Sequence, residues 1–243
     1  IGCHFRSRHS PRDGKGLELR LNWSNLNRSI TACGQCPRLI EHCKSIAREK
    51  RRAYREETYW GRPVPNFGDP KARLLILGLA PGAHGANRTG RMFTGDRSGD
   101  WLYQALFEVG FANQAESSNR GDGLKLKDCA ITAICHCAPP ANKPSRDEID
   151  NCRDWLSATI DQGKVKVLLA LGQIAWKGAL DQAFCRGWLT GRRPQFAHGQ
   201  QVSLSGGKWL LACYHPSQQN TFTGRLTRKM LRDVFQTARQ LIE

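Results

Sequence analysis

The chain has 243 residues, 40% of them hydrophobic, so it can build at least one folded domain. It carries 37 Lys and Arg against 21 Asp and Glu, a formal net charge of +16, which favours a polyanionic partner, nucleic acid before an anionic membrane surface. No apolar run approaches the roughly 18 residues of a transmembrane helix. The N-terminal residues lack the apolar segment of a secretory signal, so we expect a cytoplasmic protein.

The charge is uneven along the chain. Residues 1–72 hold 15 Lys and Arg against 7 Asp and Glu, residues 73–180 hold 13 against 11, and residues 181–243 hold 9 against 3. The near-neutral middle is typical of a fold's core, and the basic ends are typical of flanks that face a polyanion, although a generally basic surface is the alternative. We expect residues 1–20 to form a poorly ordered basic tail and residues 21–243 to form one domain.

Four short apolar runs predict β-strands. They are continuous in Leu, Ile, Val and Ala, as expected of strands buried on both faces. Because helical patterns fall between the runs, the fold class is predicted to be α/β, a four-stranded parallel sheet with helices on both faces. The runs cover residues 73–79, 130–135, 165–171 and 208–214.

Helices are indicated by periodicity and by end signals. Ser145, followed three residues later by Glu148, forms a capping box that predicts the start of a helix running to Ile160. A mostly helical leader, residues 23–59, precedes the first strand. The other predicted helices cover residues 99–110, 173–180 and 225–242.

Three polar, Gly- and Pro-rich loops follow predicted strands, over residues 80–100, 136–144 and 215–227. In an open parallel sheet, chemistry is located beyond the carboxyl ends of the strands. The sequence therefore predicts that these three loops converge on an active site.

Ten cysteines in a chain that is neither short nor visibly secreted favour a metal site over a disulfide framework. Cys33 and Cys36 form a CxxC pair, and Cys137 and Cys152 can complete a set of four thiolates, which suits zinc or an iron–sulfur cluster. A redox dithiol and four unrelated buried thiols are the alternatives. Cys135 could compete with Cys137, and the remaining cysteines are interpreted as core or incidental thiols.

The loops carry a family resemblance. The segment from Gly78 to Asp96 (GLAPGAHGANRTGRMFTGD), the segment Cys137–Pro144 (CAPPANKP) and the segment His215–Ser217 (HPS) closely resemble the b-type (family 5) uracil-DNA glycosylases. The match runs in order from about Leu26 to the C-terminus. It implies a uracil-DNA glycosylase domain with a structural [4Fe–4S] cluster on the four cysteines, and so decides for iron–sulfur over zinc.

The resemblance also implies catalytic roles. Asp96 would position a water and stabilise the sugar cation, His215 would donate to the departing base, and Asn142 would assist placement of the water or base. Asp96 could instead be only a helix N-cap, His215 a satisfied loop histidine, and Asn142 a turn residue.

Further residues are implied to contact the base or the DNA. Phe93 would stack on the extruded base, although a core aromatic is the alternative. The loop that would enter the minor groove supplies candidate wedge residues and phosphate contacts. The base-binding set is Gly82, Ala83, His84, Phe93 and Ala133, and the DNA-binding set is Gln218, Gln219, Asn220, Phe222, Arg225 and Arg228.

Two positions depart from the a-type relatives, which have Glu where this chain has Leu79 and Asn where it has Ala133. A pocket with fewer polar side chains that hydrogen bond to the base discriminates less between bases. Hypoxanthine and other deaminated bases are therefore expected substrates beside uracil. We expect a monomer that acts on DNA. We also expect a monofunctional enzyme without a lyase step, because the only lysine in the three loops, Lys143, is interpreted as a surface or DNA contact and not as a buried nucleophile. The alternatives are a non-catalytic or covalent-trapping relative that binds damaged DNA and a zinc module that binds nucleic acid.

Overall fold

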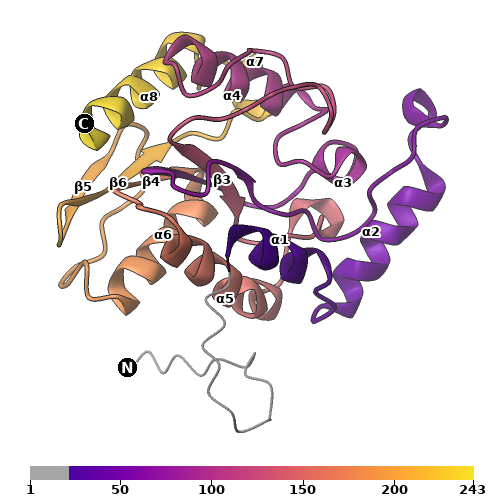
Figure 1. Ribbon diagram of the computed structural model, residues 1–243, viewed down its shortest axis with the longest axis horizontal. Coiled ribbons are helices and arrows are strands. Elements are labelled where there is room, and N and C mark those ends of the chain that lie inside the picture. Colours follow the sequence, from indigo (N-terminus) through magenta and orange to yellow (C-terminus); the bar gives the residue numbers. More distant parts are fainter. Residues whose placement is uncertain (1–21) are drawn as a thin grey trace, which may run out of the picture.

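A six-stranded sheet runs through the centre of the computed structural model, which describes residues 22–243 (Figure 1). The strand order is β1-β3-β2-β4-β6-β5. The basic tail predicted over residues 1–20 lies outside the described residues.

The four central strands are those that the apolar runs predicted. Neighbours pair in parallel, with Gly78 opposite Ala133 at the carboxyl end of one pair and Leu171 opposite Cys213 at that of another. Most of their side chains are buried, because helices cover both faces of the sheet. The strands are β2 (Leu74–Gly78), β3 (Cys129–Ala133), β4 (Val167–Leu171) and β6 (Lys208–Cys213).

The prediction of a purely parallel, four-stranded sheet is wrong. Antiparallel edge strands β1 (Phe67–Gly68) and β5 (Gln201–Leu204) extend it, pairing with β3 and β6. Strand β1 has only two residues, in a Pro- and Gly-rich segment, and the first three residues of β5 are not buried. Edge strands are covered less than central ones, so neither segment carries the continuous apolar run by which the central strands were found.

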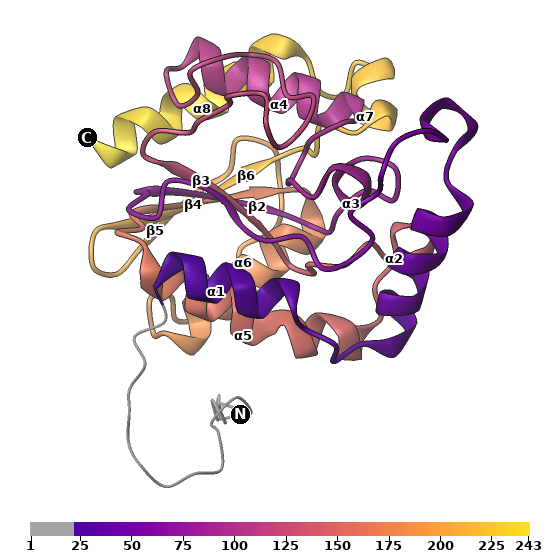
Figure 2. The ribbon, with the colours of Figure 1, turned by 45° about the vertical axis from the view of Figure 1, so that its right-hand side comes forward.

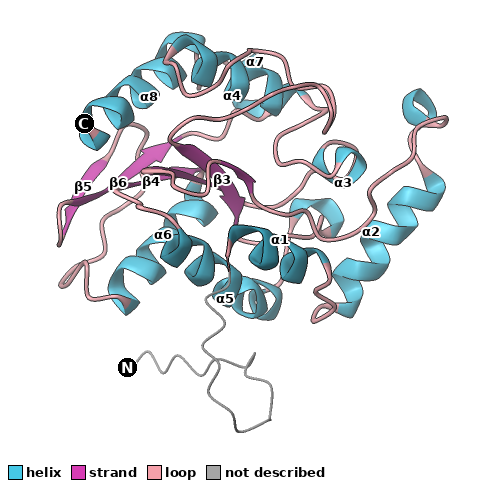
Figure 3. Ribbon diagram, viewed as in Figure 1, coloured by secondary structure: helices cyan, strands magenta, loops and turns pink. Residues whose placement is uncertain are grey.

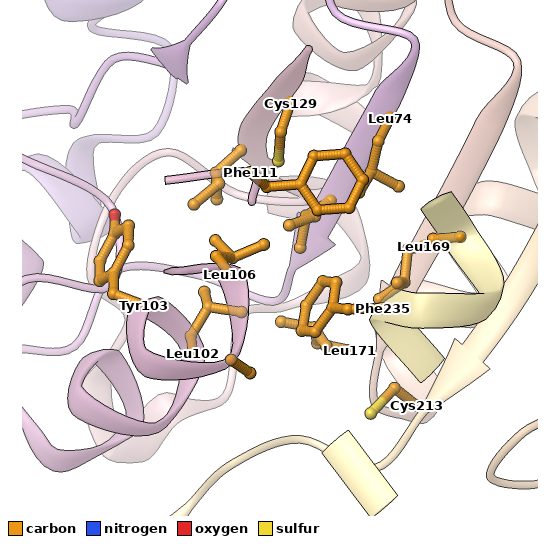
Figure 4. Close-up of a cluster of buried hydrophobic side chains, with 14 of the residues drawn as sticks. Leu74, Leu102, Tyr103, Leu106, Phe111, Cys129, Leu169, Leu171, Cys213 and Phe235 are labelled. Atoms are coloured by element: carbon orange, nitrogen blue, oxygen red, sulfur yellow. The ribbon is translucent and has the colours of Figure 1, made fainter. Parts of the chain in front are cut away.

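Helices cover both faces of the sheet, as predicted (Figures 1 and 3). Helices α4 (Arg97–Glu108) and α8 (Arg228–Ile242) lie on one face, where Leu106 and Phe235 belong to the same buried cluster as Leu169 of the sheet (Figure 4). Helices α5 (Arg146–Gln162) and α6 (Gln173–Cys185) cover the other, and α1 (Trp23–Thr31) packs beside α5 (Figure 2). Alternate residues of each strand therefore enter two separate apolar layers.

The helix ends follow local side-chain chemistry. The capping box predicted for α5 is present, with Ser145 and Glu148 each hydrogen bonded to the other's backbone. Helix α6 continues five residues beyond its predicted end. Helix α8 begins three residues after its predicted start, because the Thr227 side chain accepts a hydrogen bond from the backbone N–H of Met230 and caps it there.

The leader is mostly helical, as predicted. It contains α1, α2 (Pro37–Glu49) and the 3₁₀ turn η1 (Arg52–Tyr54). Short helices also interrupt the loops: α3 (Ala86–Thr89), the 3₁₀ turn η2 (Pro140–Asn142) and α7 (Gln218–Phe222). Within residues 22–243, no helix combines the length and the apolar character needed to cross a bilayer.

Candidate active site

A cavity of about 390 Å³ opens at the carboxyl ends of the central strands. Gly78 of β2, Ala133 of β3 and His215, which follows β6, contribute to its wall. The three predicted loops thus converge at one site. The cavity brings together Gly82, Phe93, Asp96, Ala133, Asn142, His215 and Gln218 from the predicted site residues, and adds Met92, Arg97 and Ser98.

Asp96 has two structural roles at this cavity. It is the N-cap of α4, where its Oδ1 accepts hydrogen bonds from the backbone N–H groups of Ser98 at 3.0 Å and Gly99 at 3.1 Å. It also lines the cavity. The cap therefore uses one carboxylate oxygen, and within the described residues no donor is hydrogen bonded to Oδ2.

Two glycines make room for the second oxygen of Asp96. A Cβ atom on Gly85 would lie 2.2 Å from Oδ2, and one on Gly82 would lie 3.1 Å from it. The carboxylate thus packs directly against the backbone of the first loop, an approach that only glycine allows at position 85. The glycine-rich motif fixes the carboxylate as well as shaping the loop.

The charge on Asp96 is set by opposing influences. Burial raises the pKa of its carboxyl above the ordinary value, while the two backbone donors and the nearby Arg88 charge lower it. Arg88 is a residue that the sequence analysis missed. It is 8% exposed, forms an ion pair with Glu57, and donates to the carbonyls of His84 at 2.8 Å and Gly95 at 2.9 Å.

His215 faces Phe93 across 5.7 Å between ring centroids, with the rings inclined by 31°. Burial lowers the pKa of the imidazole to about 4, so the ring is neutral at neutral pH and carries one N–H donor. The Phe93 ring lies 3.0 Å from the place where a Cβ atom of Gly78 would be, and its backbone has φ +52°. A non-glycine residue in this conformation is strained, a feature that clusters at functional sites.

Asn142 and Ala133 occupy different parts of the cavity wall. Asn142 is exposed and follows Ala141, and both have positive φ, 55° and 52°, so η2 turns sharply before α5. Ala133 is only 2% exposed. With Leu79 also in the lining, the wall at the ends of β2 and β3 is apolar.

Two predicted base-binding residues lie elsewhere. Among the described residues that line the cavity, neither Ala83 nor His84 occurs. The Nδ1 atom of His84 lies 3.1 Å from the Tyr59 hydroxyl, and the carbonyl of Ala83 accepts a hydrogen bond from Asn87. The first contact directs His84 toward the leader, and the second directs Ala83 toward α3.

Helix α7 holds the predicted wedge residues, which are not equivalent. Gln218 lines the cavity, and Phe222 is 65% exposed, with the Arg97 guanidinium carbon 4.7 Å from its ring centroid. Asn220 instead donates through Nδ2 to the carbonyl oxygen of His215 at 2.8 Å. Asn220 therefore braces the loop that carries the imidazole, whereas Phe222 projects outward.

The remaining predicted DNA contacts are exposed. Gln219 lies on the surface, and the guanidinium carbons of Arg225 and Arg228 lie 4.6 Å and 4.3 Å from the ring centroids of Tyr214 and Trp101. Contact with an aromatic ring orients an arginine without neutralising it. Both charges thus remain available to a phosphate.

The four predicted metal ligands line a second, small cavity, which lies between the leader, the segment after β3 and helix α5. Cys33 follows α1, Cys36 precedes α2, Cys137 follows β3 and Cys152 lies on α5. Two other thiols lie behind them without lining the cavity: Cys135, the competing candidate, contacts Cys152, and Cys43 contacts Cys137. In residues 22–243, no three His, Cys, Asp or Glu side chains are close enough to hold a single metal ion.

Known proteins that are similar to this chain include uracil-DNA glycosylases of types 4 and 5. The family model for the uracil DNA glycosylase superfamily matches residues 65–239. The type-5 uracil-DNA glycosylase of Mycobacterium tuberculosis is 50% identical over 218 residues, 89% of this chain and 80% of that protein. That of Thermus thermophilus is 47% identical over 88% of this chain and 95% of its own length. A type-4 enzyme of Pyrobaculum aerophilum is 32% identical over 65% of each chain.

We predict that His215 titrates near pH 4, because its half-buried ring loses hydration as an imidazolium. Proton NMR of the imidazole signals, assigned with a His215→Gln variant, measures the midpoint. Phe93→Ala should raise it toward the ordinary histidine value by admitting water. Phe222→Ala removes a ring that contacts Arg97 instead and should leave it unchanged. A wild-type midpoint near the ordinary value would contradict the buried environment.

Proposed function

The chain belongs to the type-5 uracil-DNA glycosylases, and from this premise we propose that it hydrolyses the N-glycosidic bond between uracil and deoxyribose in DNA. The observation that supports this most directly is the meeting of Asp96 and His215 in one cavity. Hydrolysis of this bond needs an anion near the sugar and a donor near the departing base, and these two residues supply them.

Asp96 is suited to the sugar side of the reaction. As the bond to the base breaks, the sugar develops oxocarbenium character, and an ionised carboxylate stabilises that positive charge. Water then adds its oxygen to C1′, and its proton passes to Asp96 Oδ2, the oxygen that the helix cap leaves free. Asn142, on the cavity wall, would help to position this water.

His215 is suited to the base side. The electron pair of the broken bond leaves with uracil, which departs as an anion, and a neutral imidazole N–H can donate to its carbonyl oxygen. Phe93, which faces the imidazole, would stack on the extruded base. Outside the cavity, Phe222 would fill the gap in the duplex, and Arg225 and Arg228 would contact phosphates.

We propose that the second cavity is the site of a [4Fe–4S] cluster, a group that four thiolates can hold. Its lining includes four cysteines, and four thiolates are the ligand set of such a cluster. Cys33, Cys36, Cys137 and Cys152 would hold the cluster. It would join the leader to β3 and α5, a structural role that leaves the hydrolysis to Asp96 and His215.

We extend the proposed substrates to hypoxanthine. The wall formed by Leu79 and Ala133 presents no side-chain hydrogen-bonding group to the base. A site that hydrogen bonds its substrate rejects analogues strongly because its own polar groups would be left unpaired, and an apolar wall lacks this penalty. The proposed pocket therefore tolerates deaminated bases other than uracil.

We predict that Asp96→Asn lowers the single-turnover rate of uracil release by roughly 10²–10⁴-fold. Asn caps helices as well as Asp does, so the start of α4 should persist while the charge is removed. Alkaline cleavage of an oligonucleotide with one uracil measures the rate. Asp100→Asn, which changes an exposed carboxylate outside the cavity lining on the same helix, is the matched control. Equal rates in the two variants would reduce Asp96 to a cap.

The pH profile tests the same residue. Because burial raises the pKa of Asp96, its ionised form is lost as pH falls through a value above that of an ordinary aspartate. The wild-type rate should therefore fall on the acid side at that higher pH. Asp96→Asn should lack this limb, while Asp100→Asn keeps it.

Ala133→Asn should add a side chain that can hydrogen bond to the base. We expect it to lower hypoxanthine release relative to uracil release by roughly 10-fold, the effect of about one hydrogen bond. Ala141→Asn adds the same side chain next to the cavity without lining it and should leave the ratio unchanged. Thermal unfolding checks that the buried position accepts the substitution, and Ala133→Ser is the smaller second variant. An unchanged ratio in folded Ala133 variants would exclude this residue from base recognition.

Iron content distinguishes the proposed ligands from their neighbours. Cys137→Ala and Cys152→Ala should lose iron, visible absorption and thermal stability together, because cluster binding and folding are coupled. Cys43→Ala, beside the cavity, and Cys129→Ala, buried on β3, should keep iron. A colourless wild-type protein with bound zinc would overturn the cluster, since Zn²⁺ is a d¹⁰ ion.

A further inference from the structure

A groove at the β1 edge of the sheet, outside the catalytic cavity, is lined by three arginines. Its walls include Arg28 of α1, Arg62 before β1, and Arg120 of the loop between α4 and β3, with Trp60 among them. We propose that this arginine groove binds the phosphodiester backbone of the substrate DNA, at phosphates beyond those next to the extruded nucleotide. The proposal rests on the proposed function only in taking DNA as the substrate.

The arginine groove has positive charge without a counter-charge. No Asp or Glu lines it, and among the described residues none of the three arginines forms an ion pair. The guanidinium carbons of Arg62 and Arg120 lie 3.9 Å and 4.4 Å from ring centroids of the same residue, Trp60. The indole orients both groups and leaves their charge in place, so their mutual repulsion favours binding of an anion.

The walls of the arginine groove are fixed by hydrogen bonds. Asn27 of α1 accepts from the backbone N–H of Asn66 at 3.0 Å and donates to its carbonyl at 3.3 Å. This pair holds α1 beside the segment that carries Arg62. The groove is therefore formed before a ligand arrives, which reduces the cost of binding.

The loop that carries Arg120 is held in shape by a largely buried carboxylate. The Asp122 carboxylate accepts hydrogen bonds from the backbone N–H groups of Ser118, Asn119 and Leu124 at 2.9–3.2 Å. It also forms an ion pair with Arg91 at 2.6 Å, and both side chains are less than 10% exposed. Arg120 thus projects from a turn with a fixed shape.

The arginine groove adjoins the catalytic cavity through one short segment. The backbone N–H of Trp60 donates to the carbonyl of Arg88 at 2.8 Å, and a Cβ atom on Gly90 would lie 2.7 Å from the Trp60 ring. Met92 and Phe93, two and three residues further on, line the catalytic cavity. One DNA molecule can therefore reach both places.

A phosphodiester chain fits the arginine groove better than a small free anion does. The groove is an open channel of about 460 Å³, and its three arginines are all exposed and spread over its walls. A backbone that crosses an open groove meets such charges at successive phosphates. Inorganic phosphate shares this chemistry and is the competing ligand to test.

The experiment measures binding of a duplex that contains a stable abasic-site analogue, so that no cleavage is needed. Arg62→Gln/Arg120→Gln should flatten the plot of log Kd against log salt concentration by about 0.9 for each phosphate that the variant no longer neutralises. Arg28→Gln, which leaves Trp60 and its two arginines intact, should flatten it by about 0.9. Lys127→Gln/Lys164→Gln, which removes two exposed charges before β3 and β4 at the opposite end of the sheet, should leave the slope unchanged.

Two results would overturn the proposal. Equal slopes in the arginine and lysine double variants would mean that the arginines act only through net charge. The second result is that inorganic phosphate raises the Tm of the wild type but not of Arg62→Gln/Arg120→Gln, while the salt slope of DNA binding is the same in both proteins. The groove would then bind small anions and not DNA. Failure of the proposed glycosylase function is distinct, since it would appear as lack of uracil release while the arginine-dependent slope persists.

Discussion

The carboxylate of Asp96 must cap α4 and face the catalytic cavity at once, and much of the surrounding structure follows from that requirement. Its Oδ1 is held by backbone donors at the start of the helix, and its Oδ2 packs on the glycines of the first loop. A side chain with both oxygens placed has little rotamer freedom to lose, so the cavity is pre-organised for its chemistry. The cap and the catalytic role proposed for Asp96 are therefore compatible.

Two buried arginines form the frame behind this carboxylate. Arg88 connects the first loop to Glu57 of the leader, and Arg91 connects it to Asp122 of the loop between α4 and β3. Removing Glu57 or Asp122 would leave a buried guanidinium charge uncompensated, so each pair favours a single arrangement of its arginine. The first loop, which supplies Phe93 and Asp96, is thereby fixed against two distant parts of the chain.

The leader belongs to the same architecture. Its cysteines meet those that follow β3 and lie on α5, and Arg38 of α2 donates to both carboxylate oxygens of Glu148, the residue that completes the α5 capping box. A cluster at this point would fix the position of the leader, and so of Tyr59 and Trp60, which contact the first loop. Metal binding in small cysteine sites is commonly coupled to folding in this way.

Local patterns in the sequence were enough to predict the four central strands, the α5 capping box and the convergence of three loops, because burial on both faces, helix capping and strand direction each leave such a pattern. A long motif also indicated most of the cavity residues. The edge strands lack a continuous apolar run, and Arg88, although it lies within the long motif, has no sequence feature that marks it as buried and ion paired, so both required the folded structure. The fold likewise placed His84 outside the cavity and made Asn220 a brace, because contacts that form only in the folded chain decide where a loop side chain points.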